Sequence, residues 1–155
     1  MKDSGKEKIN KYKAKLARYC AYRERTRHEV TTKARDLGLY HDEAEQLLEW
    51  LVAENFVNEE RFARTYVRDK FYLNKWGKNK IRQGLAQKFI SSQWAEAAMS
   101  EIAGEDYSET LYQLMTKKLA TVKADQPIAR NQKVARYLIG KGYEPELVWQ
   151  AIKNQ

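Results

Sequence analysis

Few side chains in this sequence have catalytic or metal-binding potential, and those few are far apart. The two histidines, His28 and His41, lie at or next to helix-start signals, and the single cysteine is Cys20. Neither a zinc site, which needs several such ligands together, nor a nucleophilic cysteine–histidine pair is indicated. The segment 76–78 (Trp-Gly-Lys) does not complete the glycine-rich loop that holds phosphate in nucleotide-binding proteins. We therefore expect a non-catalytic protein without a cofactor or metal.

A basic segment in the middle of the chain offers a different chemistry, which is binding to an anionic partner. Between Arg61 and Lys88 there are nine Lys or Arg and one acid, Asp69, whereas residues 1–58 carry twelve basic and ten acidic residues. The whole chain has a net charge of +8. A local excess of one sign favours DNA phosphates or an acidic protein surface as the partner. The candidate binding residues are Arg61, Arg64, Arg68, Lys75, Lys78, Lys80, Arg82 and Lys88.

The same basic segment has a second interpretation, a solvated helix face. Arg64 and Arg68 lie opposite Phe62 on a helical repeat, and long Lys and Arg stems also cover apolar surface. Two aromatic residues of the segment, Tyr72 and Trp76, could stack on exposed nucleic-acid bases or fill the seam between neighbouring units. Burial between repeats is expected for the tryptophans of the third helices, Trp50, Trp94 and Trp149.

Helical spacing of apolar residues, together with start and stop signals, predicts three helices in the first third of the chain. The first helix extends over about 9–24. Thr26 and Glu29 have the spacing of a capping box for the second helix, and Gly38 suits the left-handed position after its end. The third helix opens at Asp42.

The pattern restarts twice further along the chain. Asn58 is an N-cap for a helix that begins at the next residue, and Val57 is expected to pack on Phe62 as a hydrophobic staple. Another first helix is expected to begin near Ser108, and Pro145 suits the first position of the last helix. No segment alternates apolar and polar residues as a strand would.

The second helices of the three sets align without gaps, with 28–39, 79–90 and 132–143 offset by 51 and 53 residues. Apolar residues coincide at three positions: Val30 with Ile81 and Val134, Ala34 with Leu85 and Leu138, and Leu39 with Ile90 and Tyr143. A fixed period with a shared apolar register indicates tandem copies of one unit. We predict an all-α fold of three tandem three-helix repeats in an elongated, curved array, with domains at 1–57, 58–106 (basic) and 107–155.

Composition suits a folded chain and not a disordered one. Hydrophobic residues make up 43% of the 155 residues, and they include four Trp and ten Tyr. Cys20 shares the apolar stripe of the first helix, so we expect it to be packed and unreactive. The N-terminus has no apolar signal region, and no run has the length of a membrane span. We expect a cytoplasmic monomer that does not contact membranes.

The order and spacing of these residues resemble the RecX family of RecA regulators. The resemblance covers roughly residues 16–152 and ends in the segment RYLIGKGYEPELVWQAI at 136–152. Phe89 stands where the family usually has Gly, and Asn58 where Asp is common. The residues that carry the resemblance are Tyr22, Arg25, Thr26, Glu29, Asn58, Glu59, Arg61, Phe62, Ala63, Val67, Gly77, Ile81, Leu85, Lys88 and Ile90.

This resemblance implies tandem three-helix repeats in a crescent that lies along the groove of a RecA filament on DNA. It also implies a role in restraining filament growth and RecA activities in recombination, DNA repair and the SOS response. The expected partners are the RecA filament and, weakly and without sequence preference, DNA. Two other functions remain open: a helical DNA-binding protein whose own nucleic-acid contacts are primary, and a helical adaptor for another acidic protein.

Overall fold

The computed structural model describes the backbone of residues 2–155 and the side chains of residues 6–155. Within this part of the chain every regular element is helical, which confirms the all-α prediction. The α-helices are α1 (Lys2–Tyr22), α2 (Arg27–Asp36), α3 (Asp42–Ala53), α4 (Glu59–Arg68), α5 (Lys78–Gln87), α6 (Ser92–Ala98), α7 (Gly104–Thr121), α8 (Pro127–Gly140) and α9 (Pro145–Lys153). A π-helical turn, η1 (Asp69–Leu73), extends α4, and a 3₁₀ turn, η2 (Met99–Glu101), extends α6.

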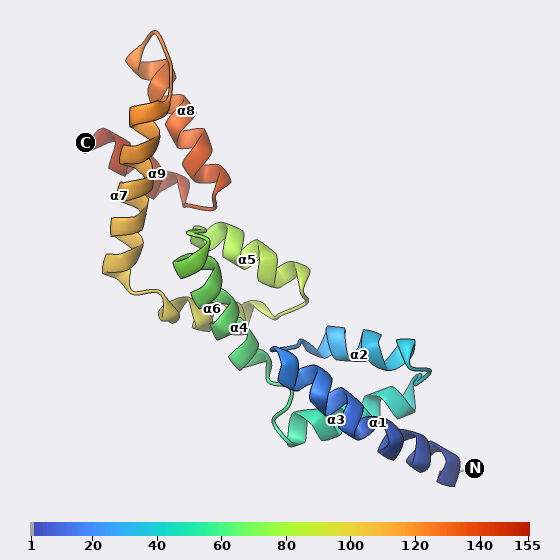
Figure 1. Ribbon diagram of the computed structural model, residues 1–155. Helices are drawn as coiled ribbons and strands as arrows, with labels where there is room; N and C mark the ends of the chain where they lie inside the picture. Colours follow the sequence, from blue (N-terminus) through green and yellow to red (C-terminus); the bar gives the residue numbers. More distant parts are fainter. Residues whose placement is uncertain (1) are drawn as a thin grey trace.

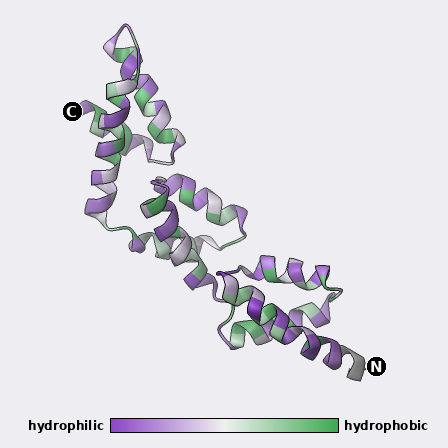
Figure 2. Ribbon diagram, in the orientation of Figure 1, coloured by the Kyte–Doolittle hydropathy of each residue, from purple (hydrophilic) through white to green (hydrophobic). Residues whose placement is uncertain are grey.

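The helices form three consecutive units along an elongated, bent array, with the two termini near opposite ends (Figure 1). We call α1–α3 the first unit, α4–α6 with η1 and η2 the second, and α7–α9 the third. Helices pack mainly within their own unit. Hydrophobic residues of each unit gather on the sides that face its other helices, and the outer sides are hydrophilic (Figure 2). The predicted repeat architecture is therefore confirmed.

Buried side chains form two separate cores. One core lies within the first unit and includes Leu16, Val30 and Leu47. The other is continuous through the second and third units and includes Phe71 and Tyr143. The second and third units consequently share a core that the first unit does not join.

The sequence signals at helix starts agree with the structure at several positions. The Thr26 hydroxyl accepts a hydrogen bond from the Glu29 amide at 3.0 Å, and the Glu29 carboxylate accepts one from the Thr26 amide at 3.3 Å, which completes the predicted capping box. The Asn58 side chain accepts from the Arg61 amide at 3.0 Å. Pro145 occupies the first turn of α9.

The turn after each second helix has the same geometry in all three units. The amide of Leu39, Ile90 or Tyr143 donates to the carbonyl of the residue five positions earlier, at 2.9, 3.1 and 3.1 Å. The preceding residue is left-handed each time, with φ of 90° at Gly38, 63° at Phe89 and 105° at Gly142. All nine aligned apolar positions are buried. Phe89 therefore makes the family's glycine turn at the expense of backbone strain, because a bulky residue disfavours positive φ.

The second and third units meet through backbone contacts that need glycine. Gly77 donates its amide to the Lys141 carbonyl at 2.8 Å, and Asn79 donates to the Gly142 carbonyl at 2.9 Å. A Cβ on Gly77 would lie 2.2 Å from the Gly142 carbonyl carbon, which no real contact allows. The Tyr143 hydroxyl adds a hydrogen bond of 2.9 Å to the Lys75 carbonyl. This junction is therefore close and specific.

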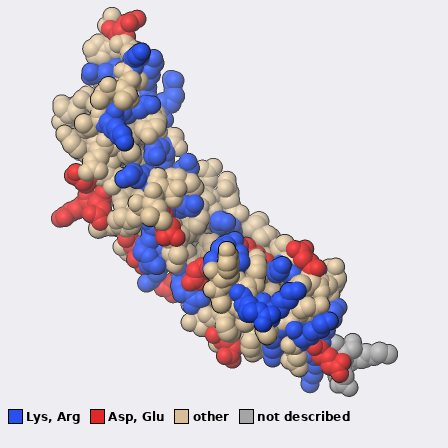
Figure 3. All heavy atoms as spheres, in the orientation of Figure 1, with Lys and Arg blue, Asp and Glu red and all other residues tan. Residues whose placement is uncertain are grey.

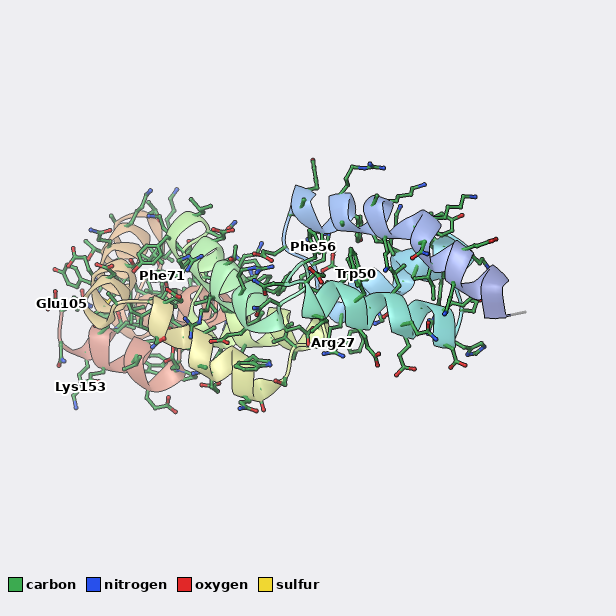
Figure 4. All side chains as sticks on the ribbon, turned by 90° about the horizontal axis from the view of Figure 1, so that it is seen from below. Arg27, Trp50, Phe56, Phe71, Glu105 and Lys153 are labelled. Carbon is green, nitrogen blue, oxygen red and sulfur yellow. The ribbon has the colours of Figure 1, made fainter. Side chains whose placement is uncertain are left out.

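The first and second units are joined by side chains instead. The Arg61 guanidinium pairs with the Glu24 carboxylate at 2.6 Å, and the Arg27 amide donates to Glu59 at 3.3 Å. The exposed Phe89 ring contacts His28 with ring centroids 4.3 Å apart. Figure 4 places Arg27 where the first and second units meet. Polar and partly exposed contacts of this kind bind two units less firmly than a shared core.

Three sequence expectations are wrong. Val57 belongs to the first core and Phe62 to the second. The expected staple between these two side chains is therefore not formed. Helix α7 begins at Gly104 and not near Ser108. Its N-cap residue, Ala103, makes no side-chain hydrogen bond, and the acids Glu105 and Asp106 in the first turn suit the positive end of the helix dipole. Trp149 is 44% exposed and is not buried between repeats. The division of the chain into domains at 57/58 and 106/107 stays a prediction.

Candidate nucleic-acid and partner interface

The candidate arginines are held in ion pairs by acids from outside the basic segment or at its edge. Arg64 pairs with Glu60 at 2.7 Å, Arg68 with Glu101 at 3.2 Å and Arg82 with Glu96 at 2.6 Å. Arg61 is engaged by Glu24, as described above. All four side chains remain between about a third and a half exposed. The charge count of the segment alone therefore overstates the positive charge that these arginines leave free.

The lysines of the same segment are differently placed. Among the side chains that the structure describes, none of the five has a carboxylate within 4.0 Å. We call this set the lysine surface: Lys70, Lys75, Lys78, Lys80 and Lys88. Lysine ammonium groups without a local anion keep their full charge for an incoming phosphate or carboxylate.

Trp76 contacts two members of the lysine surface. The ammonium groups of Lys70 and Lys80 lie 4.7 and 4.4 Å from the centroid of its ring, and the ring is half-buried against the second core. The Lys78 ammonium lies 4.6 Å from the Tyr107 ring. Cation–π contacts of this kind hold flexible lysine stems in place while the charge stays accessible.

A hollow of about 490 Å³ opens beside Trp76, between the end of α4 and the helix α5. Its walls include Tyr66, Trp76, Lys80 and Lys88. Gly84 leaves room for the Tyr66 ring, because a Cβ at this position would lie 2.0 Å from the Tyr66 hydroxyl oxygen unless that ring moved. Burial raises the pKa of Tyr66, so its hydroxyl stays protonated as a hydrogen-bond donor. Aromatic and cationic walls of this kind suit a nucleotide or a phosphate-bearing group.

The repeat alignment indicates that this hollow is specific to the second unit. Lys33 stands at the position of Gly84 in the first unit, and Tyr137 stands there in the third. Either side chain would occupy the space that Gly84 leaves. In the third unit the position carries another aromatic–lysine group, because the Lys118 ammonium lies 4.5 Å from the Tyr137 ring.

Tyr72, the other candidate for stacking, forms a link between the second and third units. Its hydroxyl donates to the Asp106 carboxylate at 2.8 Å and accepts from the Ala103 amide at 3.4 Å. The hydrogen bond to Asp106 raises the pKa of Tyr72. The ring is 45% exposed, but its hydroxyl is fixed at the junction. The structure thus brings Trp76 into the lysine surface and attaches Tyr72 to the start of α7.

Sequence reasoning left out two groups of residues that matter here. Lys70 belongs to the basic segment but was not among the candidate residues, although it is four positions after Tyr66 on the same helix and six before Trp76. The acids Glu24, Glu60, Glu96 and Glu101 were also missed. Glu60 could have been found from its i,i+4 spacing to Arg64, whereas the others depend on tertiary packing.

Two other kinds of site are absent from the described part of the chain, a membrane-spanning helix and a metal site. Its helices include none that is both long and apolar enough for a membrane crossing. Residues 6–155 also contain no group of three or more His, Cys, Asp or Glu side chains arranged to hold a metal ion. In the view of Figure 3, Lys and Arg atoms lie along the length of the molecule, and one group of acids lies near the start of α7.

Comparison with known protein families identifies the second and third units. Residues 58–99 match the family model for the second three-helix domain of RecX, and residues 105–152 match the model for the third. Together the two matches cover more than half of the chain.

Curated relatives with the name Regulatory protein RecX agree with this match. One from Clostridium perfringens strain 13 is 30% identical over 122 residues, which are 77% of this chain and 57% of the relative. One from Prosthecochloris aestuarii is 28% identical over 134 residues, 86% of each chain. The chain thus spans little more than half the length of the Clostridium relative.

Solved structures share the fold. The crystal structure of RecX from Lactobacillus salivarius superposes with a TM-score of 0.88 at 24% identity and covers 96% of both chains. A second crystal structure of a regulatory protein RecX superposes with a TM-score of 0.87 at 24% identity, over 98% of this chain and 74% of the other. The matches to both family models, the curated relatives and the shared repeat fold lead to one conclusion: this chain belongs to the RecX family.

Proposed function

We propose that this chain is a non-catalytic regulator of the RecA recombinase, which binds the RecA filament on DNA and restrains or modulates its growth and activities. RecA as the partner rests on the family resemblance, and regulation rests on the name that the curated relatives carry. The observation that carries the proposal is the lysine surface, whose ammonium groups have no carboxylate partner among side chains 6–155 and lie on an elongated helical array.

Charge explains why such a surface favours a filament on DNA. Duplex DNA carries one negative charge for about every 1.7 Å of its axis, and each lysine that neutralises a phosphate releases condensed counterions. The five lysines of the lysine surface fall within residues 70–88, so one short region supplies several phosphate contacts. An array of three units can then lie along the filament and place this region beside the DNA backbone.

The construction of the array supports a long contact with a filament. Its second and third units share one core and a close glycine junction, so they should move as one body. Its first unit is joined by an ion pair and an aromatic contact, so it has more freedom to adjust. A rigid body formed by the second and third units, with a first unit that can change its orientation, suits a filament whose groove changes along its length.

One observation favours a second candidate function, in which DNA binding by the chain itself is primary. The hollow beside Trp76 combines an aromatic ring with lysines and is large enough for a nucleotide group. A test without RecA separates the two. A DNA-binding protein would bind DNA tightly alone, whereas we expect the filament regulator to bind bare DNA weakly and without sequence preference.

The test of the proposal neutralises lysines and leaves the ion-paired arginines intact. Changing Arg64, Arg68 or Arg82 would also break a contact with an acid, so the fold and the charge would change together. We propose the triple variant Lys75→Gln, Lys80→Gln and Lys88→Gln. Its matched control is Lys6→Gln, Lys11→Gln and Lys15→Gln on α1, which removes the same charge from exposed lysines.

The assay is ATP turnover by RecA on DNA at rising amounts of each variant, after circular dichroism shows native helix content. Wild type and the α1 control should inhibit ATP turnover equally. At least about ten times as much of the triple variant should be required for the same inhibition. Equal inhibition by the triple variant at low salt would remove the lysine surface from the mechanism.

A further inference from the structure

A second hollow lies on the third unit, between α7 and α9. Its volume is about 720 Å³, and its walls include Leu111, Tyr112, Leu147 and Ala151. Tyr112 is 55% exposed and Leu147 is 38% exposed. We call this hollow the α7–α9 groove. Exposed apolar side chains in a hollow offer contact area to an apolar side chain of another molecule.

The edge of the α7–α9 groove is acidic, in contrast to the basic character of the chain. Glu105 and Glu109 lie on the wall of the groove, and within residues 6–155 no basic side chain pairs with either. Figure 4 places Glu105 and Lys153 at the same end of the molecule. Acidic atoms gather beside the start of α7 in Figure 3. A surface of this charge repels nucleic acid and attracts cationic groups.

Comparison of α4 with α7 shows that this acidic edge replaces a neutral pair. If the N-caps Asn58 and Ala103 are aligned, Glu60 corresponds to Glu105 and Arg64 to Glu109. In the second unit the two residues form an ion pair of 2.7 Å, whereas in the third unit two like charges stand four residues apart. Like charges at this spacing destabilise a helix by a few tenths of a kcal/mol. The third unit therefore carries two like charges at the place where the second unit carries an ion pair.

The second unit also shows what covers the corresponding place. With the N-caps Ser91 and Glu144 aligned, Trp94 corresponds to Leu147. The hollow beside Trp94 has about 220 Å³, and its wall includes Val52 of α3 and Val57, which precedes α4. The α7–α9 groove lacks such a cover among the described residues. In the second unit, the end of a neighbouring helix therefore lines the hollow that corresponds to the α7–α9 groove. A helix of another protein can take the same position at the α7–α9 groove.

We propose that the α7–α9 groove binds a basic amphipathic helix of a protein partner. An apolar side chain of the partner lies between Tyr112 and Leu147, and its Lys or Arg residues face Glu105 and Glu109. A helix fits better than an extended peptide, because residues 2–155 offer no strand edge to which a peptide could add. This surface goes beyond the proposed function, since it takes a cationic helix and not DNA phosphates, and it does not depend on which protein supplies the helix.

A model peptide tests the chemistry of the groove directly. The probe is a lysine–leucine peptide of about 15 residues with its leucines on one helical face, and a scrambled peptide of the same composition is its control. The groove variant is Glu105→Gln, Glu109→Gln and Tyr112→Ala. Its matched control is Glu45→Gln, Glu49→Gln and Tyr40→Ala on the first unit, since Glu45 also lies in a first turn and Tyr40 is also 55% exposed.

Binding is measured by fluorescence anisotropy with the full chain, and the contact is located by NMR shifts of the Leu147 and Ala151 methyl groups. Wild type and the matched control should bind the amphipathic peptide at least about tenfold more tightly than the groove variant does. Both should prefer it to the scrambled peptide, and its addition should shift the two methyl groups. Equal binding by the groove variant, equal binding of the scrambled peptide, or unchanged methyl shifts would overturn the proposal.

Discussion

Substitution of Gly77 by Ala should separate the second unit from the third. Gly77 has φ of −75° and ψ of 164°, which any residue can adopt, so backbone strain plays no part. The obstacle is space, because the new Cβ would lie 2.2 Å from both the Gly142 carbonyl carbon and the Tyr143 amide nitrogen. Neither backbone atom can move unless the turn after α8 moves away from the start of α5.

The magnitude follows from what that movement breaks. Two backbone hydrogen bonds, from Gly77 to Lys141 and from Asn79 to Gly142, and the bond from the Tyr143 hydroxyl to Lys75 would all be lost or lengthened. At roughly 1 kcal/mol each, with about 1–3 kcal/mol for overpacking, the loss is about 4–6 kcal/mol of unfolding free energy. The lower backbone entropy of alanine in the unfolded chain offsets less than about 1 kcal/mol of this.

Urea unfolding followed by circular dichroism measures the effect. The matched control is Gly104→Ala, since a Cβ there meets no atom within 4 Å. We expect the control to stay within about 1 kcal/mol of wild type and Gly77→Ala to unfold at a much lower urea concentration. If both variants unfold at the same urea concentration, the glycine junction does not hold the units together.

Three other predictions concern packing, pH and reactivity. Phe62→Ala should lower the unfolding free energy by about 3–5 kcal/mol, because Phe62 is 5% exposed in the shared core; an unchanged thermal melt would show that it contributes little packing. Burial raises the pKa of Tyr107 and Tyr143 above the ordinary value of 10.0, so the unfolded chain loses these protons first. The unfolding free energy should therefore stay constant below pH 10 and fall above it, by up to about 1.4 kcal/mol per pH unit for each tyrosine. Tyr107→Phe should reduce the slope of unfolding free energy against pH in that range. Cys20 is buried and burial raises its thiol pKa, so a thiol reagent at pH 7 should label it only as fast as the first unit opens; rapid labelling of the native chain would contradict the packing around it.

Apolar periodicity predicted the fold because the same physical requirement acts three times. A second helix must bury one stripe in each unit, so Val30, Ile81 and Val134 are all buried as their alignment indicates. The N-caps at Thr26 and Asn58 could also be predicted from sequence, because each cap side chain accepts a hydrogen bond from the amide three residues later. The start of α7 was missed because the helix dipole there attracts acids without a capping side chain.

The candidate site was less predictable, because its charge balance depends on packing. Glu24 lies 37 residues from Arg61 in the sequence, and Glu96 lies 14 residues from Arg82. No local pattern connects such partners, so counting charges along the chain treated the arginines as free. The lysines could be proposed from sequence, but their separation from acids is visible only in the folded chain.

The turn at Phe89 and the α7–α9 groove were beyond sequence reasoning for a related reason. Phe89 adopts positive φ, which a bulky residue disfavours, because the hydrogen bonds of the turn fix this conformation and its ring packs against His28. The groove arises because α7 and α9 leave Tyr112 and Leu147 uncovered, which depends on where the neighbouring unit ends. Both features result from how units meet.

Cosedimentation of the wild-type chain with RecA tests the central claim most directly. RecA would be pelleted as filaments on DNA with ATP bound, and parallel samples would lack DNA, nucleotide or RecA. We predict that the chain pellets with the complete filament and much less in each of the other samples, and that added salt weakens this binding because the lysine surface is electrostatic. A chain that stays in the supernatant with complete filaments at low salt, or that pellets equally with DNA alone, would contradict the account.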